Sequence, residues 1–106
     1  MSRTTKKVGG QLIDKSSKMP LSESLVTIIL IDPQRPDDRP NYEVTLTVEG
    51  YKPELDNKIL LLKFGDDLIG EIFISISTHE LPGRQTHFKV NLQDSIWNNL
   101  EWFKKI

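Results

Sequence analysis

Two histidines in this chain have the spacing that could hold a metal ion. His79 and His87 flank Pro82-Gly83, a dipeptide typical of a chain reversal. If the flanking segments pair around a three-residue loop, the two histidines become cross-strand neighbours with Cβ atoms about 4.5–5.5 Å apart, close enough to share a metal. Glu80 would point to the opposite face, so the obvious third ligand is missing. We therefore expect two exposed histidines and no metal site.

Carboxylates stand next to one another at Asp37-Asp38 and at Asp66-Asp67. General acid and base catalysis needs burial or a nearby charge that separates the pKa values of two such groups. Both pairs lie in segments with loop composition, and neither has the alternating spacing of a calcium-binding loop. Turn formation and solubility explain them better than catalysis.

Glu71 is the acidic residue with the most unusual setting, because it follows Gly70 and precedes an apolar run. By strand parity it shares a face with Phe73 and Ser75, so that face is expected to be partly covered. A half-buried carboxylate there needs a lysine or arginine partner. The alternative is a charge that discourages edge pairing.

Aromatic residues near the C-terminus suggest a binding surface. On a helix, Ile96, Leu100 and Phe103 form one apolar stripe. Trp97 then lies on the flank of this stripe and Trp102 lies nearly opposite, exposed to solvent. Exposed tryptophan is enriched at protein interfaces and in carbohydrate-binding platforms. Trp97, Trp102 and Tyr51 are therefore the candidate binding residues, with burial in the core as the competing interpretation.

Several chemistries are absent from the sequence. The chain has no cysteine, which excludes disulfides, thiolate nucleophiles and cysteine-ligated metals. No phosphate-binding glycine-rich loop or nucleophile elbow is present, so we expect no cofactor and no enzymatic activity. The formal net charge is -1, which makes nucleic acid an unfavourable partner. The apolar runs are too short to span a bilayer, and no signal peptide is recognisable, so we expect a cytoplasmic protein.

The elements that must position these residues are mainly strands. We expect a disordered basic tail over residues 1–7, which carries Arg3, Lys6 and Lys7, and a single β-rich domain over residues 8–106. Runs rich in β-branched residues, bounded by turn-forming residues, predict about six strands. These are residues 8–13, 25–31, 42–49, 58–64, 68–76 and 87–92.

The strand over residues 42–49 has the clearest pattern, because apolar and polar residues alternate along it. Gly65-Asp66-Asp67 predicts a hairpin between the next two strands. The strands from 42 to 92 are then expected to form a meander with one core face. After them, Asp94 can cap a short C-terminal helix whose last turn carries Lys104 and Lys105, although an edge strand is the alternative.

The beginning of the chain resembles the first two strands of transthyretin-like and immunoglobulin-like sandwich domains. The resemblance rests on residues 10–14, on Pro20-Leu21 and on residues 26–28. It covers less than a third of the chain, and we carry no function across from it. The predicted fold is a mainly β, antiparallel meander or sandwich of about six strands with a short C-terminal helix.

For function, the sequence favours a non-enzymatic protein–protein interaction module, such as an accessory, inhibitor or immunity-type domain. The alternative is a carbohydrate- or small-ligand-binding β-domain that uses its exposed aromatic residues. A metal-dependent hydrolase built on the two histidines is a third interpretation. Homo-oligomerisation stays open, because a small sheet has edge strands that must be covered.

Overall fold

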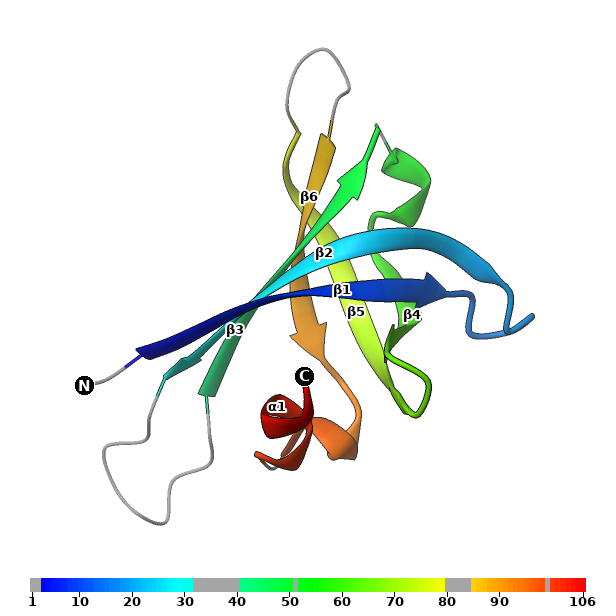
Figure 1. Ribbon diagram of the computed structural model, residues 1–106. Coiled ribbons are helices and arrows are strands. Elements are labelled where there is room, and N and C mark those ends of the chain that lie inside the picture. The colour runs from blue at the N-terminus through cyan, green and yellow to red at the C-terminus, as the bar shows by residue number, and fades with distance from the viewer. Residues whose placement is uncertain (1–2, 32–40, 51, 80–84, 99) are drawn as a thin grey trace.

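The computed structural model describes residues 3–31, 41–50, 52–79, 85–98 and 100–106, and within these ranges it is dominated by β-strands (Figure 1). The strands are β1 (Arg3–Ile13), β2 (Pro20–Ile31), β3 (Asn41–Glu49), β4 (Lys58–Phe64), β5 (Leu68–His79) and β6 (Gln85–Leu92). Three short helices accompany them: η1 (Pro53–Leu55), η2 (Ser95–Asn98) and α1 (Glu101–Lys105).

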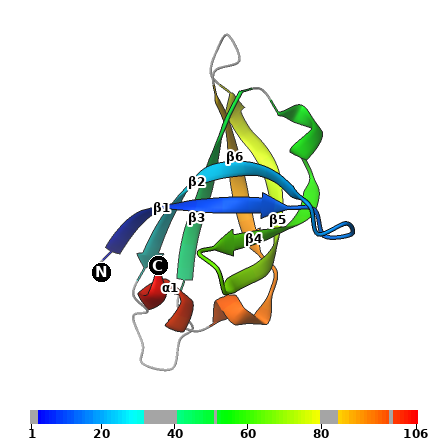
Figure 2. The ribbon, with the colours of Figure 1, turned by 45° about the vertical axis from the view of Figure 1, so that its right-hand side comes forward.

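The six strands form a closed antiparallel barrel in the order β1-β2-β3-β6-β5-β4 (Figures 1 and 2). The mainly β class, the antiparallel strands and the short helix are as predicted, but the prediction of an open meander or a sandwich is wrong. β3 pairs with β6 and not with β4, while β4 pairs with β1. Closure of this kind pairs the edges that an open sheet would leave free, but only where the first and last strands overlap, here over Gln11–Ile13 of β1.

The first strand starts earlier than the sequence suggested. The prediction of a disordered basic tail over residues 1–7 is wrong for residues 3–7, which belong to β1 and pair with β2 from Arg3↔Ile31 to Lys7↔Thr27. The prediction rested on the polar composition of this segment, but a strand can form through backbone hydrogen bonds without apolar side chains. In addition, the Lys6 ammonium donates to the backbone oxygen atoms of Phe103, at 2.6 Å, and Ile106, at 3.1 Å.

The core lies inside the barrel and follows the alternation of the strands. In β3 the residues Val44, Leu46 and Val48 are buried and the residues between them are more exposed, as predicted. The β4–β5 hairpin is also confirmed, with strand pairing from Lys58↔Ile74 to Phe64↔Leu68. Gly65 in its turn has φ 62°, a conformation that glycine adopts without steric cost.

The barrel consists of two three-stranded halves that separate at one end. In the part of the chain that the structure describes, β3 and β6 pair from Val44↔Val90 to Glu49↔Gln85 and no further. On the other side of the barrel, β1 and β4 pair only from Gln11↔Lys63 to Ile13↔Leu61. Beyond these pairs the β1–β2–β3 half diverges from the β4–β5–β6 half, and α1 lies at the open end (Figures 1 and 2).

The C-terminal segment fills the open end of the barrel with aromatic side chains. The ring of Trp102 lies 4.9 Å from that of Tyr42 in β3 and 6.2 Å from that of Phe64 in β4, measured between centroids. Trp97 contacts Trp102 edge-to-face at 4.9 Å. These rings therefore bridge the two halves at the end where the described strands of one half do not pair with those of the other.

Candidate functional site

The tryptophans predicted as binding residues are part of the core. Trp97 and Trp102 are each only 2% exposed, so the predicted exposure of Trp102 is wrong. The chain here forms two short helical segments in place of one regular helix, so the side chains point in other directions than a single helix predicts. Of the predicted apolar stripe, Leu100 is the residue that is exposed, at 36%. Both indole N–H groups are satisfied internally, by the carbonyls of Glu71 and Trp97. Tyr51 lies outside the described residues.

The two histidines are not direct partners in the strand ladder. In the β5–β6 pairing, Thr78 lies opposite His87 and His79 lies opposite Thr86, because the register shifts between Ile76 and Thr78. The His87 ring also makes a hydrogen bond to the Thr47 hydroxyl, with Nδ1 2.9 Å from Oγ1. Within the described residues, no group of three or more histidine, aspartate or glutamate side chains could hold a metal ion.

The acidic residues singled out in the sequence lie in a turn or in an ion pair where the structure describes them. Asp66 and Asp67 are exposed in the β4–β5 turn, as their composition predicted, whereas Asp37-Asp38 lies outside the described residues. The partner expected for a half-covered Glu71 is present: the Lys15 ammonium lies 2.9 Å from the Glu71 carboxylate, whose side chain is 29% exposed. This ion pair connects the β1–β2 turn to β5.

The first candidate binding surface is the edge of β1 that faces away from β2. From Arg3 to Gly10, β1 has a strand partner on one side only within the described residues, because β4 reaches no further than Gln11. An edge of this kind presents backbone N–H and C=O groups that can pair with another extended chain. We call the segment from Arg3 to Gly10 the β1 edge.

The surroundings of the β1 edge are hollowed where the two halves separate. One cavity of about 170 Å³ lies between β1 and the β4–β5 turn and is lined in part by Val8, Phe64, Leu68 and Ile106. A second, of about 320 Å³, is lined in part by Gly9, Gly10 and Lys63. A Cβ atom at Gly9 would have no neighbour within 4 Å. Glycine within a strand often marks a place where another backbone approaches closely.

The β1 edge carries positive charge and no acidic residue. Arg3 and Lys7 are exposed on the outer face of the sheet, whereas Lys6 points inward and contacts α1. The Lys6 ammonium also lies 4.6 Å from the centroid of the Phe103 ring, which fixes it in place. Arg3 and Lys7 are therefore the two cations of the edge that face solvent.

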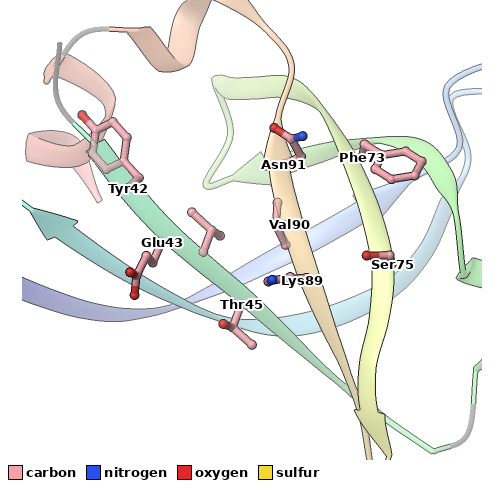
Figure 3. Close-up of a pocket in the computed structure, with 9 residues that line it drawn as sticks. Tyr42, Glu43, Thr45, Phe73, Ser75, Lys89, Val90 and Asn91 are labelled. Carbon is pink, nitrogen blue, oxygen red and sulfur yellow. The ribbon is translucent and has the colours of Figure 1, made fainter.

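The second candidate is a groove of about 600 Å³ where β3 and β6 begin to separate (Figure 3). Glu43 and Thr45 reach it from β3, Lys89 and Asn91 from β6, and Ser75 from β5 (Figure 3). We call it the β3–β6 groove. Its lining has hydroxyl, amide and charged groups, a mixture that suits a polar ligand.

Electrostatically, the β3–β6 groove has one acidic and one basic wall. Within the described residues, neither Glu43 nor Lys89 takes part in an ion pair. Burial raises the pKa of the Tyr42 hydroxyl, and a hydrogen bond with Trp102 partly opposes this. Tyr42 therefore stays neutral at physiological pH.

Comparisons with known proteins give no independent indication of function. The chain matches no protein-family model, and no curated protein or solved structure shows a significant similarity to it. No helix in the described ranges has the length and apolar character needed to cross a bilayer. The candidate surfaces therefore rest on geometry and charge. Sequence reasoning missed both of them, although the basic residues next to Gly9-Gly10 were a signal for the β1 edge.

Proposed function

We propose that this protein is a non-enzymatic protein–protein interaction module that binds an extended, acidic segment of a partner protein along the β1 edge. The observation that supports this proposal is the one-sided pairing of β1 from Arg3 to Gly10. A partner strand added there satisfies the backbone groups that face away from β2, which is the physical basis of peptide recognition by strand addition.

The charge of the β1 edge favours an acidic partner. Arg3 and Lys7 point to the same face because their positions differ by four, an even number. Cross-strand pairs of opposite charge contribute about 0.2–1 kcal/mol each, and like charges directly opposite each other are destabilising. An added strand with carboxylates on this face is therefore preferred over a basic one.

The other face of the added strand lies toward the inside of the open end. The cavity there has apolar walls from Val8, Phe64, Leu68 and Ile106, next to the exposed Lys105. Side chains alternate between the two faces of a strand. The expected ligand therefore alternates acidic and apolar residues.

The direct test measures binding of a fluorescein-labelled peptide of alternating glutamate and valine to the purified protein by fluorescence anisotropy. We expect saturable binding that weakens with added salt, because the contributing charges are exposed. The same peptide with lysine in place of glutamate should bind at least about tenfold more weakly. Methylation of alternate backbone nitrogens that face the protein should abolish binding, because it removes the donors of the new ladder.

Matched protein variants locate the site. Lys7→Glu should weaken peptide binding by about tenfold, whereas Lys89→Glu, an equal change on the exposed side of β6, should not. Amide chemical shifts should change along β1 on peptide addition. No binding of the acidic peptide, or equal effects of the two variants, contradicts the proposal.

A second candidate function, the binding of a small polar ligand, is favoured by the size of the β3–β6 groove. Its volume of about 600 Å³ lies within the range of small-molecule sites, roughly 300–1,000 Å³. A ligand with both a cationic and an anionic group would match Glu43 and Lys89. Nuclear magnetic resonance titration with a panel of free amino acids and monosaccharides tests this candidate. Shifts confined to β3 and β6 that disappear in Lys89→Glu support it, and unchanged spectra across the panel contradict it.

A further inference from the structure

The outer face of β2 is unusually apolar for a surface that the described residues leave partly open. Its inward residues Val26, Ile28 and Leu30 are buried. On the outward side, Leu25 is 47% exposed and Ile29 and Ile31 are partly exposed, with Thr27 between them and the exposed Glu23 beyond Leu25. An apolar run of this kind is typical of a strand that is covered on both faces.

Opposite charges flank this apolar row on its two sides. The ladders place Thr5 of β1 and Glu43 of β3 on either side of Ile29. The exposed cations Arg3 and Lys7 lie on the same face of β1, two residues before and two residues after Thr5. The outer face thus has a basic strip on β1, an acid on β3 and, between them on β2, a row of apolar residues that Thr27 interrupts and the exposed Glu23 follows.

We propose that this face binds a second copy of the chain, with a two-fold axis that runs parallel to β2 between the copies. Such an axis leaves each residue at the same height along β2, but it places β1 where β3 lies in the other copy and β3 where β1 lies. The β1 strip of one copy therefore lies over β3 of the other, which brings Arg3 and Lys7 close to Glu43 of the second copy. The apolar rows meet in the centre, as in packing of two sheets face to face.

The charges on β1 and β3 favour this arrangement over the other in-plane axis. An axis perpendicular to β2 would place β1 over β1 and bring the basic strips together, and like charges at an interface are unfavourable. Gly9, which pairs with Leu25, has no side chain and leaves room beside it for the facing sheet. This inference goes beyond the proposed peptide binding and does not depend on it, because a dimer packs on the face of the sheet and needs no pairing with the backbone of the β1 edge, although Arg3 and Lys7 take part in both.

Sedimentation equilibrium of the whole chain between roughly 1 and 500 µM tests the proposal, since this range covers dimers of moderate affinity. We expect a reversible monomer–dimer equilibrium. Leu25→Glu should raise the dimer dissociation constant at least about tenfold, because it places a charge on the most exposed apolar residue of the row. The matched control is Ile59→Glu, because Ile59 is exposed to a similar extent, 48%, on β4. It should leave the equilibrium unchanged.

A charge exchange tests the orientation of the two copies. Lys7→Glu and Glu43→Lys should each weaken the dimer, and the double variant should regain most of the wild-type affinity. Circular dichroism melting of each variant verifies folding. If Leu25→Glu does not fold, Lys7→Glu and Glu43→Lys test the dimer in its place. A monomer at all concentrations contradicts the proposal, as does a dimer that responds to Ile59→Glu but not to Leu25→Glu. Failure of the double variant to recover contradicts the proposed axis.

Discussion

The indole ring of Trp97 packs directly against Gly70 of β5, in the space that a side chain at Gly70 would occupy. A Cβ atom built on Gly70 would lie 2.6 Å from Trp97 Cε2 and 2.6 Å from Ile96 Cδ1. The same indole donates a hydrogen bond of 3.0 Å to the Glu71 carbonyl. The absence of a side chain at this position therefore lets the C-terminal segment dock on the barrel.

Replacement of this glycine should displace the tryptophan. We expect Gly70→Ala to lower the free energy of unfolding by about 1–3 kcal/mol, the usual cost of overpacking a core. Urea denaturation followed by tryptophan fluorescence measures this, with a red-shifted emission in the folded state as Trp97 gains solvent. Gly9→Ala is the control, because its Cβ meets nothing within 4 Å. Equal destabilisation by the two variants would contradict this role of Gly70.

Trp102 should behave as a core residue in a stability measurement. Because it is 2% exposed and packs against Tyr42, Phe64 and Trp97, we expect Trp102→Ala to cost about 3–5 kcal/mol of unfolding free energy. Thermal melting by circular dichroism measures the loss. Leu100→Ala, at an exposed neighbouring position, should change stability by less than about 0.5 kcal/mol. An unchanged melting temperature for Trp102→Ala would contradict the burial of this residue in the core.

Thr86 connects the β3–β4 crossover to β6 through a fully buried hydroxyl. Its Oγ1 donates to the Gly50 carbonyl at 2.7 Å and accepts from the Lys52 N–H at 3.1 Å. Thr86→Val keeps the shape of the side chain but leaves both backbone groups without this partner. We expect a loss of about 1–3 kcal/mol in chemical denaturation. Thr45→Val, at an exposed position, is the control, and a similar small effect of both variants would contradict the role.

The Tyr42 hydroxyl should make stability depend on pH in the alkaline range. Burial raises its pKa above the ordinary value of 10.0, so that the unfolded chain loses this proton at a lower pH than the folded chain. The unfolded state then binds fewer protons between the two pKa values, and stability falls as pH rises through this window. Below pH 10 the contribution of Tyr42 is fully present. Urea denaturation of wild type and Tyr42→Phe from pH 8 to about 11 isolates the effect from lysine titration.

In the Tyr42 experiment, the stability difference between the two proteins should be constant below pH 10 and should shift in favour of Tyr42→Phe above it. Absorbance at 295 nm, compared between the two proteins, reports the ionisation of Tyr42 directly. A difference that does not change with pH would mean that the hydroxyl is not shielded from water.

Local sequence patterns predicted much of the strand content correctly. The alternation along β3 identified its buried face, and Gly65 with two aspartates identified the β4–β5 hairpin. The same parity argument placed Glu71 on a partly covered face, and the interpretation with a cationic partner, one of the two that the sequence left open, is the one the structure has, with Lys15 as that cation. Each of these inferences concerns residues close together in the chain, or the side of a strand to which a residue points.

The tertiary structure decided which strands are neighbours, and with them the candidate site. A period of two indicates the face of a strand but carries no information on its partner, so pairing of β3 with β6 in place of β4 had no local signal. Closure of the barrel made an inner space that Trp97 and Trp102 fill, and it ended the β1–β4 ladder early enough to leave the β1 edge open. These features depend on contacts between residues far apart in the chain, where the geometry of packing outweighs local preference.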